Sequence, residues 1–241
     1  MRPFAIAVAL LCIGAGSGVL RGADSTEVDL RKLPLDVFSD QKAVWTSPAR
    51  MNRNTAKWWI VIGAATAALI ATDQHTITTF ENAPTQLRWG NNISYVGSAY
   101  TVVPIAAGFY VVGALAHNHK ATKTGYLASE ALLDGLIVQE VLKPVAGRNR
   151  PNAPHEKQEW FEGGASFPSG HAIASWGVAS VIAHQYGQHK WVPYVAYGLA
   201  GVVGAARFTA QQHYASDIVA GGAIGWFIGR YVVHHHDRDA Q

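Results

Sequence analysis

Six apolar stretches dominate the chain beyond residue 57 and constrain its fold more than any other feature. Their lengths and their Ala, Gly, Leu and Val content favour helices over strands. The polar links between most of them are short, which favours antiparallel neighbours. The sequence therefore predicts an all-α fold built as a six-helix bundle. The stretches are residues 58–71, 95–116, 126–142, 171–186, 191–206 and 214–233.

The composition favours a bundle that crosses a membrane. Hydrophobic residues make up 49% of the chain and charged residues only 15%, against about 25% charged in an average soluble domain. A spanning helix needs about 20 mostly apolar residues, which residues 95–116 and 214–233 provide. Trp58, Tyr95 and Trp191 lie near stretch ends, as in an interfacial aromatic belt. The other stretches are shorter and the mean hydropathy is only +0.06, so a soluble helical bundle stays the alternative.

Charge and cysteine content exclude several classes of protein. The 241 residues fit one sizeable domain, and 19 cations against 16 acids give a net charge of only +3. No basic run with interleaved aromatic residues is present, so we expect no nucleic-acid partner. Cys12 is the single cysteine, which rules out an internal disulfide framework and a cysteine metal site.

The first 56 residues differ from the rest. Residues 1–23 combine an early cation, an apolar run and small residues, which predicts a signal peptide or an N-terminal anchor. Residues 24–56 carry alternating charges with Pro34 and Pro48 and are predicted to form an exposed polar leader. The main domain is expected to cover residues 57–236.

Three short segments in the second half carry cations suited to phosphate. Lys143 and Arg150 lie in the first segment and Arg207 in the third. Arginine offers a planar fork that matches two phosphate oxygens, whereas lysine offers a point charge. Phosphoryl transfer is catalysed mostly by positioning and cationic stabilisation. Arg148 is either an auxiliary phosphate contact or a solvated loop charge.

The second segment, Pro168 to His171, lies where the fourth stretch begins. N–H groups exposed at a helix start bind anions. Gly170 would let an oxygen approach the backbone, and the Ser169 hydroxyl could donate to it. His171 could then protonate a departing oxygen. The alternative is a serine N-cap with an incidental histidine.

His213 and Asp217 are four residues apart, so on a helix they would share a face. The carboxylate could then accept a hydrogen bond from one ring nitrogen and leave the other nitrogen free to attack phosphorus. A buried structural His–Asp pair is the alternative interpretation.

Alternation of the six helices predicts that these residues meet. Lys143, His171, Arg207 and His213 fall at helix ends on one side of the bundle, which we call the rim. The opposite side carries an excess of cations, which makes it cytoplasmic and the rim external by the positive-inside rule. A signal peptide that sends the leader outward would give the reverse orientation. The opposite-side cations are Arg50, Arg53, Lys57, Lys120, Lys123, Lys190 and Arg238.

The three segments read Lys-x6-Arg-Pro, Pro-Ser-Gly-His and Arg-x5-His-x3-Asp, and together they span residues 143–217. In this order and spacing they resemble the signature of the type 2 phosphatidic acid phosphatase (PAP2) superfamily. That superfamily includes membrane lipid phosphatases, class A acid phosphatases and vanadium haloperoxidases. The resemblance implies a PAP2-type helical domain over residues 57–236. One departure is Ala206, where the family usually has serine before the arginine.

The resemblance also implies roles for the residues. His213 would be the nucleophile that forms a phosphohistidine, Asp217 would orient it, and His171 would be the general acid and later the base. The phosphate oxygens would be held by Lys143, Arg150, Ser169, Gly170 and Arg207. No metal or other cofactor is expected.

Two groups of polar residues lie outside these motifs. Glu130 and Asp134 are one helical turn apart and could be functional or could serve packing and capping. The run from His234 to His236 is a metal-binding tract by composition only, and we interpret it as the end of the last helix.

The sequence therefore predicts a metal-independent phosphatase of the bacterial-type cell envelope. It would hydrolyse a phosphomonoester or pyrophosphate, with a phosphorylated lipid as the expected partner and the membrane as its location. The alternatives are a soluble periplasmic acid phosphatase acting on small phosphoesters, and a non-catalytic membrane component that binds phospholipid.

Overall fold

The chain folds as an all-helical bundle in a computed structural model that describes residues 29–79, 84–94, 99–153 and 159–239. The predicted signal peptide or anchor, residues 1–23, lies outside the described residues. No strand occurs in these ranges. The elements are α2 (Leu33–Thr46), the 3₁₀ helix η2 (Ser47–Arg50), α3 (Arg53–Thr79), α4 (Pro84–Ser94), α5 (Ala99–Leu115), α6 (His119–Ala146), α7 (Gly170–Gln185), α8 (Trp191–Thr209) and α9 (Ala215–Asp239).

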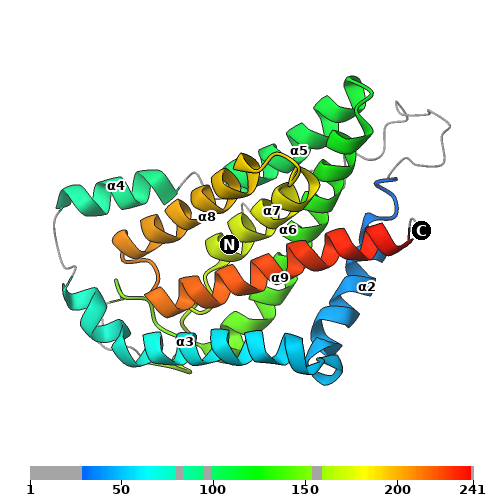
Figure 1. Cartoon of the computed structure of the whole chain (residues 1–241). Coiled ribbons are helices and arrows are strands. Elements are labelled where there is room, and N and C mark those ends of the chain that lie inside the picture. Colours follow the sequence, from blue (N-terminus) through cyan, green and yellow to red (C-terminus); the bar gives the residue numbers. More distant parts are fainter. Residues whose placement is uncertain (1–28, 80–83, 95–98, 154–158, 240–241) are drawn as a thin grey trace.

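The prediction of an all-α fold is confirmed, and each of the six apolar stretches is a helix. They correspond to α3 and α5 to α9 (Figure 1). Two more helices were not predicted. The amphipathic α4 packs along α8, and α2 lies within the predicted polar leader. Leu33 and Val37 of α2 are buried against the bundle, because residues four apart share one helical face.

The centre of the bundle is the close contact between α7 and α9. A Cβ atom on Gly225 would lie 2.2 Å from the Ile173 carbonyl oxygen, and one on Gly229 would lie 2.3 Å from that of Gly177. Only glycine permits this approach of two helix backbones. The pairing brings the start of α7 beside the start of α9, where the catalytic motifs lie.

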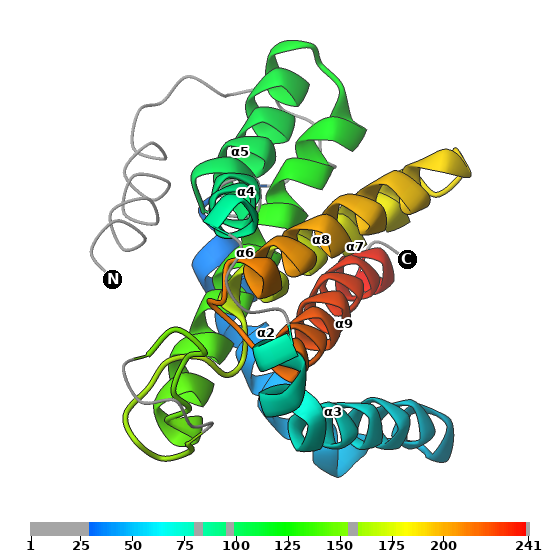
Figure 2. The same ribbon diagram turned by 90° about the vertical axis from the view of Figure 1, so that its left-hand side faces the viewer.

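Helix α3 lies along α9 on the outside of the bundle (Figures 1 and 2). Trp59 packs edge-to-face against Phe227, with 5.4 Å between the ring centroids. Most of α3 is exposed, including Trp58, Ile60 and Val61. Near its C-terminal end Asp73 turns inward and is buried, so this helix also reaches the rim.

Within the described residues, one helix combines the length and the mean hydropathy expected of a membrane span. It is residues Arg53–Thr78, with a mean hydropathy of 1.3 over its most apolar window. The two stretches that the sequence singled out by length do not meet both criteria. Helix α5 is apolar but shorter, and α9 ends in the polar run from His234 to Asp239.

Candidate active site

The rim gathers the ends of four helices, as their alternation predicts. Lys143 lies in the last turn of α6, Arg207 in the last turn of α8, and His213 just before α9. His171 is in the first turn of α7 and interacts electrostatically with all three and with Arg150. The structure therefore brings both histidines and the three predicted cations into one site.

Ser169 and Gly170 form the start of α7. Ser169 is the N-cap residue, and its backbone N–H donates to the Asp217 carbonyl oxygen at 3.0 Å. Its hydroxyl is fully buried and has no hydrogen-bond partner. A Cβ atom on Gly170 would lie 1.8 Å from Gln139 Oε1, so a side chain here would displace Gln139. The helix start thus holds a hydroxyl donor without a partner, as suits an anion site, and its glycine leaves room for the Gln139 side chain.

The cations differ in how they are held. Arg150 is half-buried, and its Nη1 donates to Gln212 Oε1 at 3.0 Å. Burial lowers the pKa of Arg150 from its ordinary value, but a guanidinium keeps its proton at neutral pH. Arg207 is buried, and its Nε has no hydrogen-bond partner. Such unsatisfied buried donors are costly, and a bound phosphate oxygen would satisfy them.

His213 is oriented by a backbone carbonyl group and not by direct contact with Asp217. Its Nδ1 lies 2.8 Å from the Ser166 carbonyl oxygen, whereas Asp217 Oδ2 is 3.7 Å away. A carbonyl oxygen can only accept, so Nδ1 carries the proton and Nε2 has the lone pair. The predicted hydrogen bond from His213 to Asp217 is therefore replaced by one to the Ser166 carbonyl oxygen. The ring still has the predicted tautomer, with the proton on Nδ1.

The reason is local geometry. Helix α9 begins at Ala215, so His213 precedes it and the spacing of four residues does not place the two side chains on one helical face. Asp217 instead accepts from the Tyr214 backbone N–H at 2.9 Å and from the Ser166 hydroxyl at 2.5 Å. It thereby caps the helix and holds the segment that carries the Ser166 carbonyl group.

Burial keeps the His213 imidazole neutral. It lowers the pKa of His213 to about 4, with Arg207 and Arg150 acting in the same direction and Asp217 opposing them. At neutral pH the ring is therefore the uncharged form that can act as a nucleophile.

Arg148 plays neither of the roles that the sequence offered. It is fully buried, and its Nη2 lies 2.8 Å from Asp73 Oδ2 while its Nη1 lies 2.5 Å from Asp217 Oδ1. The guanidinium also packs on the rings of Trp160 and Tyr214, at 4.6 and 4.1 Å from their centroids. Arg148 thus connects α3, the loop before α7 and α9 behind the phosphate site.

Sequence reasoning missed three residues of this support. Asp73 accepts from the backbone N–H and the hydroxyl of Ser216, and Ser166 contacts both His213 and Asp217. The sequence does offer a sign for Asp73, because it is the one acidic residue in the largely apolar helix α3. Acidic residues in such helices tend to pair inside a bundle. Nothing in the local sequence marks Ser166 or Ser216.

Known proteins match the same part of the chain. The model of the PAP2 superfamily matches residues 123–240, which contain every predicted site residue. This match shows a similarity to the PAP2 superfamily over residues 123–240. Ala206, which precedes Arg207 where the resemblance leads us to expect serine, is buried in α8.

A lipid A 1-phosphatase from Porphyromonas gingivalis is 32% identical over 65 residues, which cover 27% of this chain and 15% of that protein. The fold is similar to that of a transmembrane PAP2-type phosphatidylglycerolphosphate phosphatase from Bacillus subtilis, with a TM-score of 0.53 at 19% identity over 86% of this chain and 97% of the other. The fold is also similar to that of LpxE from Aquifex aeolicus, with a TM-score of 0.55 at 18% identity. That similarity covers 67% of this chain and 94% of the other.

Proposed function

We propose that the chain is a metal-independent phosphatase that hydrolyses a phosphomonoester or pyrophosphate of a lipid through a phosphohistidine at His213. One observation carries the proposal. A neutral histidine with its Nε2 lone pair available lies in the same site as two buried donors without partners, Ser169 Oγ and Arg207 Nε. That is the arrangement needed to hold a phosphate and attack it.

The reaction would proceed in two steps. Nε2 of His213 attacks phosphorus while the bond to the leaving oxygen breaks. Burial and the neighbouring cations lower the pKa of His171 to about 3, and the negative charge of a bound phosphate would raise it again. His171 would then take up a proton with the substrate and give it to the leaving oxygen. The cations Lys143, Arg150 and Arg207 offset the charge on the equatorial oxygens. Water then attacks the phosphohistidine and gives a proton to His171, the P–N bond breaks, and inorganic phosphate leaves.

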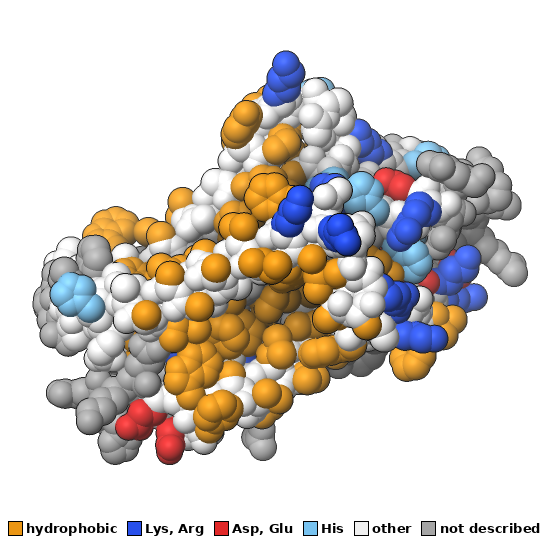
Figure 3. All heavy atoms as spheres, turned by 60° about the horizontal axis from the view of Figure 1, so that its bottom comes forward, with side chains coloured by type: hydrophobic (Ala, Val, Ile, Leu, Met, Phe, Trp, Pro, Cys, Tyr) orange, Lys and Arg blue, Asp and Glu red, His pale blue; other side chains and the backbone are white. Residues whose placement is uncertain are grey.

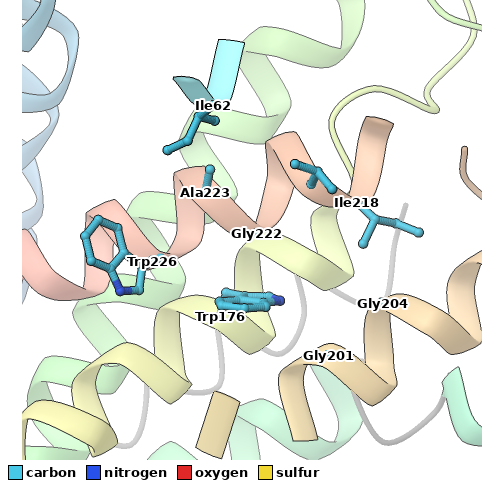
Figure 4. A pocket seen from close by; sticks show the side chains of 9 residues that line it. Ile62, Trp176, Gly201, Gly204, Ile218, Gly222, Ala223 and Trp226 are labelled. Atoms are coloured by element: carbon cyan, nitrogen blue, oxygen red, sulfur yellow. The ribbon is translucent and has the colours of Figure 1, made fainter. Parts of the chain in front are cut away.

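An apolar groove beside the rim supports a lipid substrate. A cavity of 370 Å³ lies between α3, α7, α8 and α9, flanked by Trp176 and Trp226 (Figure 4). Ile218 lines it and directly follows Asp217. Figure 3 shows that hydrophobic side chains surround the hollow on this face. A phosphate held at the rim would therefore place an attached acyl or prenyl chain against an apolar surface.

The same surface supports placement in a membrane. Exposed Trp58, Ile60 and Val61 on α3 would be costly in water and favourable in lipid. One of the two similar solved structures is described as a transmembrane PAP2-type phosphatase. The start of α6 carries Lys120 and Lys123 and lies away from the rim. From the positive-inside rule we infer that the rim faces away from the cytoplasm.

Phosphate release from purified protein tests the function. We expect His213→Ala to lower kcat/KM at least about 100-fold, as expected when a nucleophile is lost. His119→Ala, an exposed histidine at the start of α6, is the matched control and should keep normal turnover. Near-normal turnover of His213→Ala would exclude the mechanism, and no turnover by the unmodified protein on any substrate would favour a phospholipid-binding component.

The substrate class is tested by a panel of phosphorylated lipids and soluble esters. We expect kcat/KM to be highest for a phosphate or pyrophosphate on a lipid, and the intact protein to partition into the detergent phase. Preference for soluble esters together with aqueous partitioning would instead identify a soluble acid phosphatase.

A further inference from the structure

A second buried polar cluster lies far from the rim, where α2, α6 and the C-terminal part of α9 meet (Figure 1). Glu130 is thirteen residues before Lys143 on α6, a separation of about 20 Å at 1.5 Å per residue. The cluster therefore takes no part in the proposed phosphate chemistry. Its members are Asp36 and Asp40 of α2, Glu130 and Asp134 of α6, and His235 and His236 of α9.

Three of these side chains, which are all of types that bind metal ions, converge in one place. His236 Nε2 lies 2.9 Å from Glu130 Oε2 and 4.0 Å from Asp36 Oδ2. One ligand atom from each of the three lies within 4.8 Å of the others. The Tyr126 hydroxyl donates to Asp36 Oδ2 at 2.5 Å, which fixes that carboxylate beside the other two groups.

Asp40 provides an independent sign that a cation belongs here. Its side chain is fully buried, its Oδ1 lies 2.9 Å from His235 Nδ1, and its Oδ2 has no hydrogen-bond partner. The carboxyl groups of Glu130 and Asp134 both interact with that of Asp40. Carboxylates only accept hydrogen bonds, so such contacts need a proton or a metal ion between the oxygens.

The charge balance points the same way. Within the described part of the chain, the ion pairs of Asp36, Asp40 and Glu130 are with His235 and His236 and not with lysine or arginine. Buried carboxylates without a permanent cation are unfavourable. A dication would offset more of this charge than two imidazoles can.

We propose that Asp36, Glu130 and His236 form a binding site for a divalent transition-metal ion of the Zn²⁺ class. Mixed imidazole and carboxylate ligands suit Zn²⁺ better than Mg²⁺. In a tetrahedral Zn²⁺ site, bonds of about 2.0–2.2 Å place the ligand atoms roughly 3.3–3.6 Å apart. The ligand atoms lie within 4.8 Å of one another, so the partly exposed Asp36 carboxylate would have to move inward by roughly 1–1.5 Å. His236 Nε2 and Glu130 Oε2, which are 2.9 Å apart, would have to separate slightly.

The site joins three segments that are distant in sequence. Helix α2 contacts the bundle through few apolar residues, chiefly Leu33 and Val37. A metal bound by Asp36 of α2, Glu130 of α6 and His236 of α9 fixes α2 to the bundle. Its role is structural, so metal binding raises the midpoint of thermal unfolding and leaves the chemistry at the rim unchanged.

Metal content and affinity test this proposal without reference to phosphatase activity. The full chain is purified in detergent without a polyhistidine tag, stripped with EDTA and titrated with Zn²⁺, and Co²⁺ is used as a spectroscopic probe of the ligands. We expect one Zn²⁺ per chain and a higher unfolding midpoint. His236→Gln and Asp36→Asn should each weaken Zn²⁺ binding at least about tenfold, since even partners of the ligands contribute roughly 10- to 100-fold.

His234→Gln is the matched control, because His234 belongs to the same run but is exposed and lies outside the cluster. It should bind Zn²⁺ as the unmodified chain does. Equal loss in His234→Gln would overturn the site and identify a simple histidine tract. Failure of the unmodified chain to bind Zn²⁺ would also overturn the proposal. Protons shared between the carboxyl groups would then explain their close contacts. Asp36 is partly exposed, so its variant remains informative if a buried variant does not fold.

Discussion

Arg148 and Asp73 form a fully buried ion pair between residues 75 positions apart, with 2.8 Å between Nη2 and Oδ2. The same guanidinium pairs with Asp217 of α9. Through these two contacts the outer helix α3 is attached to the segment that carries His213. The rim is therefore supported by a buried charge network that lies behind His213.

Loss of Arg148 should destabilise the fold. Arg148→Met leaves the carboxylates of Asp73 and Asp217 buried without their cation, which typically costs about 3–5 kcal/mol. Arg148→Lys should restore little, because one ammonium cannot serve two acids as a planar fork does. Chemical unfolding in detergent measures the change. Arg53→Met, at an exposed position in the first turn of α3, should stay within about 0.5 kcal/mol, and equal effects at the two positions would contradict the network.

Removal of the Ser169 hydroxyl should weaken phosphate binding without destabilising the fold. The hydroxyl is buried and unpaired, so Ser169→Ala removes a costly unsatisfied group and should raise the unfolding free energy, by up to about 1–3 kcal/mol. A hydrogen bond to a charged group contributes about 1.5–3 kcal/mol, so inhibition by inorganic phosphate should weaken by about tenfold or more. Inhibition constants measure this effect.

Ser175→Ala provides the comparison for that experiment. Ser175 is buried further along α7, and its hydroxyl donates to the Ala172 carbonyl oxygen. Its loss should leave phosphate inhibition unchanged. Unaltered inhibition in Ser169→Ala as well would show that the hydroxyl does not hold phosphate.

The pH profile should report the buried His213. Only the neutral ring has a lone pair for attack, so activity is present above the pKa of His213 and is lost as pH falls through it. With that pKa lowered to about 4, the acid limb of kcat/KM should lie near pH 4 and not near the ordinary histidine value of about 6.5. Arg207 contributes to the lowering, so the residual activity of Arg207→Gln should have its acid limb at higher pH. An acid limb near 6.5 in the unmodified protein would contradict a buried neutral nucleophile.

Much of the candidate site could be predicted from local sequence. The apolar stretches identify the helices because burial imposes their composition and length, and alternation of those helices places Lys143, His171, Arg207 and His213 at one end. The spacing within a motif reflects contacts within one or two helical turns. The residues expected to face phosphate can therefore be predicted without a structure.

The supports of that site depend on contacts that no short segment encodes. His213 is oriented by the backbone carbonyl group of Ser166. Every residue has such a group, so this contact cannot be predicted from residue types. Arg148 looked like a loop charge because its partners, Asp73 and Asp217, lie on α3 and α9. For the same reason the sequence predicts a polar leader where α2 lies, and it gives no sign that Asp36, Glu130 and His236 come together. The sequence by itself determined the helices and the residues that meet at the rim. The packing of distant helices decided which charges are buried together, because burial depends on the folded structure and not on the local sequence.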